Sequence, residues 1–571
     1  MAKDVSRRDR YQFGWVRRTA SIFLCSAVLF SMTSFMASDL RAMAAEQEYK
    51  GIGKYVFSEN REIAPGLTLQ TNESVNTSGE QKSNTFTFNP KTGSVKPVVT
   101  SGSYVWGGET VADMAEGQSG TVVAGVNGSF FDINNGTPRG EVIEDGELTS
   151  AVGGYDRVGT STYPSGATGS QLKNGYALVG FRKDGSFASG VGNYSITYDV
   201  EGSDGTKKVT GWNIYFFNKY YSSMSNWIYL FSNKYGTSTH TNEAGDEVIM
   251  EIQSGKIELG GSVTAKVVEK RTNSTNAPIG ENQLVLYAAN GSNKFNDIDQ
   301  HIEVGDIITI YASDLNESIN HFADPENPVV NALTGLAVPI VQDGKVSDDV
   351  YSYADVTANN PRTAIGVKED GSVVLFQVDG RQDDWSIGMN GQTIAEHMVD
   401  QGCDTAYFLD GGGSSTALAR LPGDDDLSLL NKPSDGSERA DSNCILLIAN
   451  DTATGTATRL NSYPGKIQIL AGSQYDLSKL SVKASDESGY PAAMPGTLTY
   501  TADSQIGSIS GNTFTASSNG GDGQITLQSG SIQGILDVEV INRVDEIQSD
   551  VPIISTAVGA SLQIGVTAYR N

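Results

Sequence analysis

Residues 401–416 read QGCDTAYFLDGGGSST, and this stretch sets the local fold from which the rest of the chain can be interpreted. Its apolar run, residues 406–409, is typical of a buried strand. The glycines that follow Asp410 tolerate positive φ and a close approach of the backbone to another group, because they lack a Cβ. The stretch therefore predicts a strand that ends in a carboxylate, N–H donors and hydroxyls, which suits a sugar or a phosphate. The alternative is an ordinary glycine turn between two strands.

The segment GQTIAEHMVDQG, residues 391–402, leads directly into that strand and has helical spacing. Ile394 and Met398 fall on one face, Thr393 lies near the expected start, and Gly402 is a stop signal. We therefore expect a short helix followed by the buried strand. Residues 109–117 predict a second short helix.

The chain has 571 residues, of which 64 are glycine, and short strand patterns outnumber long helical ones. This length suggests three or four domains at about 150 residues each. We expect an α+β mixed-sheet domain over residues 45–455 and an all-β, immunoglobulin-like sandwich over residues 456–543. Residues 544–571 resemble the start of that sandwich, so we expect an incomplete second repeat and a truncated chain.

The first 44 residues predict an export signal. Six Lys and Arg residues precede an uncharged stretch, residues 19–38, and Ala42-Met43-Ala44 is an A-x-A cleavage site. The alternative is an uncleaved membrane anchor, because the stretch approaches the length of about 18 residues that a span needs. We expect the general secretory route and a secreted or cell-surface protein.

Removal of residues 1–44 would leave 33 Lys and Arg against 64 Asp and Glu, a net charge of −31. A surface of this charge repels nucleic acid and anionic lipid, so an anionic substrate would need a local group of arginines. Cys403 and Cys444 would be the remaining cysteines, either paired or as two buried thiols. No HExxH or CxxC motif occurs, and we expect no cofactor, although paired aspartates could hold a divalent cation.

Polar residues stand at predicted strand ends in four segments, residues 122–148, 361–382, 401–416 and 431–448. The residues at these ends are Asn127, Arg362, Asp379, Arg381, Asp410 and Arg439. If the strands are neighbours, these groups converge on one rim. Arginine forks bind phosphate oxygens, and a carboxylate pair can act on an anomeric carbon. Taken singly, each residue could equally belong to a hairpin turn or a surface ion pair.

Five motifs in this order resemble the phosphodiester glycosidase family, which includes the N-acetylglucosamine-1-phosphodiester α-N-acetylglucosaminidase of eukaryotes. They are NGSFF at residue 127, PRTAIG at 361, VDGR at 378, DGGGSST at 410 and PSDG with its following arginine at 433. The resemblance covers about residues 60–450. It implies hydrolysis of the bond between an anomeric carbon and a phosphodiester, giving a free sugar and a phosphomonoester.

The resemblance also implies a set of site residues: Asn127, Arg362, Asp379, Arg381, Asp410, Gly411, Gly412, Gly413, Ser414 and Arg439. Arg362, Arg381 and the glycine N–H groups would hold the phosphate. One of Asp379 and Asp410 would activate water or attack the anomeric carbon, and the other would stabilise positive charge on the sugar ring. Asn127 would bind a sugar hydroxyl or N-acetyl group, with Glu141 and Asp132 as further acids.

For an exported protein of this type, we expect a carbohydrate phosphodiester substrate in a wall polymer or capsular polysaccharide, with an N-acetylglucosamine-type sugar. The alternative is a non-catalytic surface protein that binds such glycans. A third possibility, a glycosidase without phosphate preference, would not need Arg362.

Overall fold

The computed structural model describes residues 52–76, 78–152, 177–191, 194–222, 226–292, 294–314, 322–336, 338–348, 350, 354–544, 546–549 and 566–569. The predicted leader, residues 1–44, lies outside the described residues. Contacts divide the described chain into two compact units. The first contains the residues up to 455 together with 486–491, and the second contains the others after 455.

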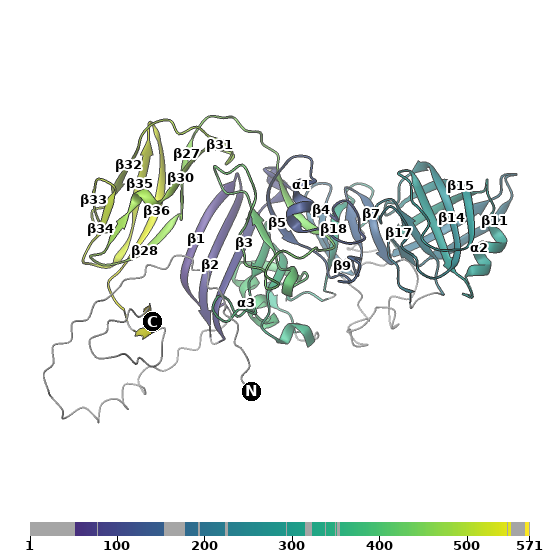
Figure 1. Ribbon diagram of the computed structural model, residues 1–571, viewed down its shortest axis with the longest axis horizontal. Helices are drawn as coiled ribbons and strands as arrows, with labels where there is room; N and C mark the ends of the chain where they lie inside the picture. Colours follow the sequence, from purple (N-terminus) through teal and green to yellow (C-terminus); the bar gives the residue numbers. More distant parts are fainter. Residues whose placement is uncertain are drawn as a thin grey trace, which may run out of the picture. The chain divides into compact units, whose positions relative to one another are not determined.

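An eight-stranded antiparallel sheet forms one layer of the first unit. Its first three strands lie side by side in Figure 1 and pair in sequence order before the chain enters the centre of the sheet. In sheet order the strands are β1 (Lys54–Ala64), β2 (Leu67–Asn76), β3 (Gly79–Phe88), β22 (Val373–Val378), β21 (Arg362–Lys368), β23 (Cys403–Phe408), β19 (Val341–Gln342) and β20 (Lys345–Val346).

A five-stranded sheet packs against this layer. Its strands, in order, are β25 (Ser428–Leu429), β24 (Ala417–Ala419), β5 (Thr121–Asn127), β26 (Cys444–Ala449) and β4 (Val95–Thr100). Buried side chains of both sheets, among them Leu375 and Val126, form one core. Val122 and Val126 of β5 lie four positions apart, which by alternation alone would put them on one face. They belong to two different cores because a register shift between Val122 and Ala124 interrupts the alternation.

Two helices cover the outer faces of these sheets. Helix α3 (Gly391–Asp400) places Ile394 and Met398 against the eight-stranded sheet, as the spacing predicted, although its N-cap is Asn390. Helix α1 (Val111–Glu116) packs Met114 against the five-stranded sheet. The order of layers is therefore helix, sheet, sheet, helix, and the loop after β23 lies where the two sheets meet.

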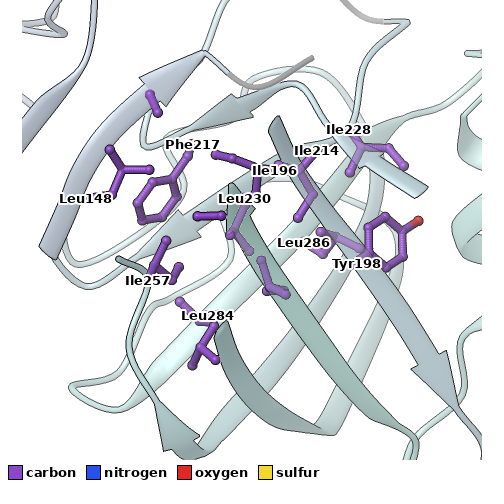
Figure 2. Packing of buried hydrophobic residues seen from close by; sticks show 14 of the residues in the cluster. Leu148, Ile196, Tyr198, Ile214, Phe217, Ile228, Leu230, Ile257, Leu284 and Leu286 are labelled. Carbon is purple, nitrogen blue, oxygen red and sulfur yellow. The ribbon is translucent and has the colours of Figure 1, made fainter. Parts of the chain in front are cut away.

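A thirteen-stranded sheet makes up the rest of this unit. Its strands, in order, are β11 (Lys207–Ile214), β10 (Tyr194–Glu201), β17 (Ile307–Asp314), β15 (Gly261–Ser274), β14 (Gly245–Gly255), β16 (Gln283–Ala289), β13 (Tyr229–Ser232), β12 (Phe216–Phe217), β7 (Glu147–Val152), β6 (Val142–Glu144), β18 (Val329–Gly335), β8 (Ala177–Arg182) and β9 (Phe187–Val191). Figure 2 shows part of its core, where Phe217, Leu230 and Ile257 converge.

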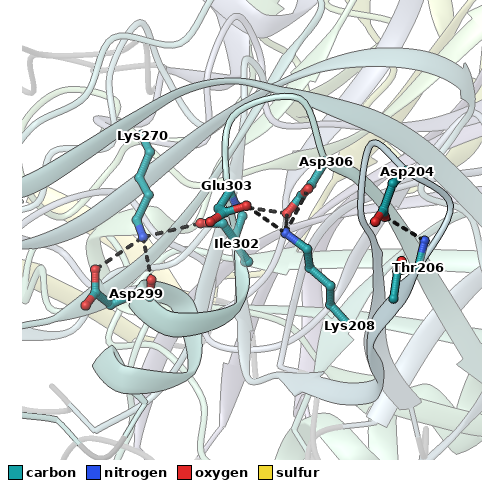
Figure 3. A network of polar contacts seen from close by, with 8 residues as sticks. All are labelled: Asp204, Thr206, Lys208, Lys270, Asp299, Ile302, Glu303 and Asp306. Atoms are coloured by element: carbon teal, nitrogen blue, oxygen red, sulfur yellow. Dashed lines mark hydrogen bonds and ion pairs between the residues drawn. The ribbon is translucent and has the colours of Figure 1, made fainter.

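Helix α2 (Phe295–His301) and the turn after it are tied to this sheet by the ion pairs drawn in Figure 3. Lys208 Nζ lies 2.9 Å from Asp306 Oδ2 and 3.1 Å from Glu303 Oε2. Lys270 Nζ lies 3.2 Å from Asp299 Oδ1. The network holds lysines of β11 and β15 against the α2 segment.

The second unit consists of short strands around its own core. They form sheets ordered β27 (Arg459–Tyr463), β30 (Ser481–Ser485), β31 (Pro491–Ala492); β28 (Lys466–Leu470), β36 (Ile532–Ile541), β35 (Gly521–Ser529), β32 (Leu498–Ala502); β29 (Gln474–Asp476), β34 (Thr513–Ala516), β33 (Gly507–Ser510); and β37 (Glu546–Ser549), β38 (Val566–Tyr569). The predicted α+β, sheet-rich class is confirmed. The immunoglobulin-like assignment stays a prediction.

Candidate functional site

The loop after β23 has the close approaches that its glycines predicted. Gly412 has φ +66°, in the left-handed region that glycine adopts without strain. A Cβ at Gly411 would lie 2.8 Å from the carbonyl oxygen of Pro361, and one at Gly413 would collide with Arg439 and Asp435. Three consecutive residues without side chains therefore let the 3-10 turn Gly412–Ser414 pass under neighbouring groups.

Asp410 begins this loop and keeps part of its surface exposed to solvent although protein surrounds it on most sides. The Gly411 N–H donates to its Oδ1 at 2.9 Å, and the Ser414 hydroxyl donates to its Oδ2 at 2.8 Å. A carboxylate can accept about four hydrogen bonds, so Asp410 retains acceptor capacity.

The pKa of Asp410 is shifted towards neutral pH. Burial raises the pKa to about 6, because a charged carboxylate loses water in this position. The two hydrogen bonds limit the rise, and so do the positive charges of Arg439 and Arg139. A carboxyl group with this pKa can exchange protons near neutral pH, as a general base must.

Asn127, at the end of β5, holds the Asp410 loop in place. Its Nδ2 donates to the carbonyl oxygen of Asp410 at 2.8 Å. Its Oδ1 accepts from Thr363 Oγ1 at 2.7 Å and from the Thr416 N–H at 3.1 Å. The side chain is fully buried. Asn127, which was predicted to bind the sugar, thus uses its side chain to join the Asp410 loop to Thr363 of β21.

Asp379, after β22, is 2% exposed and accepts four hydrogen bonds. They come from Gln377 Nε2 at 2.9 Å, Asn431 Nδ2 at 3.0 Å, Trp385 Nε1 at 2.7 Å and the Lys432 N–H at 2.9 Å. Burial raises its pKa, and these donors oppose the rise. The carboxylate joins the turn after β22 to the segment 431–432 and has no acceptor capacity left for a substrate.

The guanidinium of Arg381 lies over the glycine loop. Arg381 has φ +61°, an uncommon backbone conformation outside glycine, and its Nε donates to Asn360 Oδ1 at 2.8 Å. A Cβ on Gly412 would lie 3.0 Å from Arg381 Nη1. The side chain is exposed, and its two terminal nitrogens make no hydrogen bond to any described residue. They are therefore open to an anionic ligand.

Arg362 borders the start of the glycine loop, where a Cβ on Gly411 would lie 3.5 Å from Arg362 Cδ. Its neighbour Thr363 faces Asn127, and alternation along β21 turns Arg362 to the opposite face of the sheet. There its guanidinium lies 5.6 Å from the centre of the Phe408 ring, and Nη2 donates to the Ala358 carbonyl at 3.2 Å. The structure thus places Arg362 and Arg381 beside adjacent glycines of the loop, Gly411 and Gly412. The role of Arg362 as a phosphate ligand stays a prediction.

Arg439 lies beside Ser414 on the other side of the loop. Its Nη2 is 2.6 Å from Asp435 Oδ2, and its Nη1 donates to Ser414 Oγ at 3.3 Å. The Asp435 ion pair fixes the orientation of the guanidinium. Arg439 thus supports the loop and contributes positive charge near Asp410.

Two residues near Asp410 were not among the predicted site residues. Arg139 is half-buried, lowers the pKa of Asp410 by its charge, and makes no side-chain hydrogen bond to the described residues. Its loop is held by fully buried Lys219, whose Nζ donates to the carbonyls of Pro138 and Gly140. In the sequence, the available signal for Arg139 was the triplet Pro138-Arg139-Gly140, which follows a pair of loop asparagines.

The second of these residues is Asp441, which is 1% exposed, and neither of its carboxyl oxygens has a hydrogen-bond partner among the described residues. Its backbone pairs with Glu109 in both directions, at 2.8 and 3.0 Å. Burial raises its pKa well above the usual range, and the charge of Asp410 raises it further. In the sequence it stands between Arg439 and Asn443 and resembles a surface aspartate.

The further predicted acids are engaged locally. Glu141 is buried, and its Oε1 accepts from the Val152 N–H at 3.3 Å. Asp132 Oδ1 accepts from the N–H and Nδ2 of Asn134 at 3.0 and 2.9 Å. Cys403 and Cys444 are buried free thiols.

The described ranges contain neither a candidate metal centre nor a candidate membrane span. No cluster of three or more His, Cys, Asp or Glu residues there could hold a metal ion. None of the helices in that part of the chain is long and apolar enough to cross a membrane.

Comparison with known proteins adds a family likeness. Residues 258–448 match the phosphodiester glycosidase family. This segment contains Arg362, Asp379, Asp410 and Arg439, but not Asn127 or Arg139.

Two curated proteins are similar over shorter segments. One is the SPbeta prophage-derived uncharacterized protein YomE of Bacillus subtilis (strain 168), 35% identical over 102 residues, or 18% of this chain and 15% of YomE. The other is the N-acetylglucosamine-1-phosphodiester alpha-N-acetylglucosaminidase of Mus musculus, 30% identical over 138 residues, or 21% of this chain and 25% of that enzyme. The matches thus span a quarter or less of the length of these relatives.

Among solved structures, a hypothetical protein from Synechocystis is 16% identical, with 69% of this chain and 64% of that chain covered. Its TM-score of 0.49 is too low to define a shared fold.

Proposed function

We propose that the first compact unit hydrolyses sugar-1-phosphodiesters at the bond between the anomeric carbon and the phosphate oxygen. The observation that carries the proposal is Asp410, a partly exposed residue whose carboxylate has spare acceptor capacity and a pKa of about 6. The match of residues 258–448 to phosphodiester glycosidases supports the same reaction class.

In this proposal, Asp410 acts as the general base. A water oxygen bonds to the anomeric carbon while its proton passes to Asp410, and the bond from that carbon to the phosphate oxygen breaks. The electron pair leaves on the phosphate oxygen, so the products are a free sugar and a phosphomonoester. A phosphomonoester is a good leaving group, and strong protonation by an acid is not required.

Arg381 and Arg139 are the proposed phosphate ligands, with Arg439 adding positive charge behind Ser414. Guanidinium groups bind phosphate oxygens through short, charge-assisted hydrogen bonds. The leaving phosphomonoester gains negative charge in the transition state, so fixed positive groups stabilise that state more than the bound substrate. Arg381 contributes more of the phosphate binding than Arg139 in this assignment, because its terminal nitrogens face the loop and have no partner among the described residues.

We further propose an N-acetylglucosamine-type sugar, because the similar mouse protein is by name an N-acetylglucosamine-1-phosphodiester alpha-N-acetylglucosaminidase. The leader pattern in residues 1–44 supports export, and with export a wall or capsular polysaccharide as the natural substrate. The tail after residue 455 would act as an immunoglobulin-like spacer.

The test is hydrolysis of UDP-GlcNAc and of the methyl phosphodiester of GlcNAc-1-phosphate by the purified full chain in ¹⁸O-labelled water. We expect the label in the released sugar and unlabelled phosphomonoester, because water attacks carbon. Label in the phosphate would mean attack on phosphorus and a phosphodiesterase. Saturable binding of a phosphodiester glycan without release, across a panel of wall polymers, would favour the glycan-binding alternative.

A further inference from the structure

Asp441 is a buried carboxyl group near Asp410 that the proposed reaction does not use. It lies just before β26, whose partner β5 ends at Asn127. The Gly128 N–H donates to the Asn443 carbonyl at 2.9 Å, and the Gly128 carbonyl accepts from the Asp410 N–H at 2.9 Å. One residue, Gly128, therefore links the segments that carry the two carboxyl groups.

Ser414 stands between these carboxyl groups. A serine hydroxyl donates one hydrogen bond and accepts two. Ser414 donates to Asp410 Oδ2 at 2.8 Å and accepts from Arg439 Nη1 at 3.3 Å, which leaves one lone pair. Ser414 also lowers the pKa of Asp441 as a hydrogen-bonding neighbour, although the carboxyl oxygens of Asp441 accept no hydrogen bond from a described residue.

The charges around Asp441 are mixed. Asp410 and Glu438 are the acidic groups that raise its pKa, and Arg439 opposes them. The Glu109 carboxylate, on the segment paired with Asp441, accepts from the Ser103 N–H at 3.0 Å. An ionised carboxylate with no hydrogen bond and almost no solvent is very costly, so the neutral acid is the stable form.

We propose that Asp441 is a protonated positioning residue that completes a relay to Asp410. Its carboxyl O–H donates to the remaining lone pair of Ser414 Oγ, and the Ser414 O–H donates to Asp410. The relay polarises Ser414 and strengthens its hydrogen bond to the Asp410 carboxylate, because linked hydrogen bonds reinforce one another. The two carboxyl groups then hold one proton between them at neutral pH, and they titrate as a pair.

This inference rests on the proposed function for its kinetic consequence. Activity needs Asp410 ionised and Asp441 protonated, so kcat/KM falls at low pH when Asp410 gains a proton. It also falls at high pH when Asp441 loses its proton, since two carboxylates would then face each other and repel an anionic substrate. The wild-type profile is therefore bell-shaped.

The test compares pH profiles of kcat/KM for the full-length wild type, Asp441→Asn and Asp441→Leu. Asparagine keeps the shape of the side chain and a donor to Ser414. The pH of the acid limb should therefore stay within about half a unit of the wild-type value, while the alkaline limb disappears. Leucine removes the donor, so the acid limb should move to higher pH. Asp246→Asn is the control, a buried carboxyl in β14 whose oxygens also lack hydrogen bonds to described residues, with Lys270 Nζ 3.9 Å from its Oδ2.

If the acid limb of Asp441→Asn lies about one pH unit below that of the wild type, the relay is overturned, because Asp441 would then normally be a charged neighbour of Asp410. An unchanged alkaline limb would overturn it as well. Infrared difference spectra at pH 7 provide a readout without turnover. The carbonyl stretch of a protonated carboxyl group should be present in the wild type and lost in Asp441→Asn. Its absence from the wild type would refute the relay even if the chain hydrolyses nothing.

Discussion

The turn at Asp379 and the loop at Asp410 look alike in the sequence but differ in their surroundings. Each aspartate follows a buried strand and precedes a glycine. Asp379 is almost inaccessible and accepts four hydrogen bonds from uncharged donors. Asp410 accepts two, keeps some exposure and lies near the charges of Arg139 and Arg439. The comparison favours a structural role for Asp379 and supports the reactive role proposed for Asp410.

The largest expected effect is on the rate of Asp410→Asn. An amide cannot take a proton from water, so kcat should fall about 10³-fold. The melting temperature should stay near that of the wild type, because the substitution removes a charge that burial disfavours. Steady-state kinetics and a thermal melt measure both quantities. Asp426→Asn, an exposed aspartate in the loop between β24 and β25, is the control and should not change the rate.

Asp379→Asn should show the reverse pattern. An amide nitrogen in place of one carboxylate oxygen would face two donors, and the free energy of unfolding should fall by about 3 kcal/mol. Urea unfolding measures this loss. The rate per folded molecule should fall far less than in Asp410→Asn. Wild-type stability together with a 10³-fold loss of rate would reverse the two roles.

Substitution of either of two arginines should change kcat/KM or stability by a smaller amount than the aspartate substitutions. Arg381→Gln removes a guanidinium with two open nitrogens, so kcat/KM should fall about tenfold to a hundredfold, mainly through kcat, because this group stabilises the transition state more than the bound substrate. Stability should change little because Arg381 is exposed. Arg362→Gln should instead destabilise the Phe408 face and leave kcat/KM per folded molecule nearer to the wild type. Equal kinetic losses in both variants would mean that Arg362 also reaches the phosphate.

The smallest effect concerns the loop backbone. Gly412→Ala puts a Cβ at positive φ and 3.0 Å from Arg381 Nη1, so stability should fall by about 1 kcal/mol and kcat/KM a few-fold. Gly436→Ala has the same backbone strain at φ +92° but meets nothing within 4 Å. It should lose similar stability without loss of rate. Matching kinetics in both variants would exclude a role for the contact with Arg381.

The sequence predicts the strand ends better than the side chains that meet there. The helix at 391–400 and the strand before Asp410 follow from periodicity and cap residues, since these signals are local. The direction of Arg362 depends on the register of β21 against its neighbours, which adjacent Arg-Thr residues do not reveal.

The hydrogen bonds of Asp379 and the isolation of Asp441 come from residues distant in sequence. Asn431 and Lys432 reach Asp379 across more than 50 positions. The carboxyl group of Asp441 is buried beside the paired segment at Glu109 and has no hydrogen-bond partner among the described residues. No local pattern distinguishes these two aspartates from turn residues, so the division of roles needed the fold.

The central claim, that ionisation of Asp410 controls the reaction, is tested most directly by the acid limb of kcat/KM in the wild type and in Arg139→Gln. Arg139 lowers the pKa of Asp410, and it is not among the groups that shift the pKa of Asp379. We predict a wild-type limb near pH 6, with activity lost as the pH falls and Asp410 gains a proton. In Arg139→Gln the limb should move to higher pH. A limb that stays in place in Arg139→Gln, or lies near pH 4 in the wild type, would contradict the account.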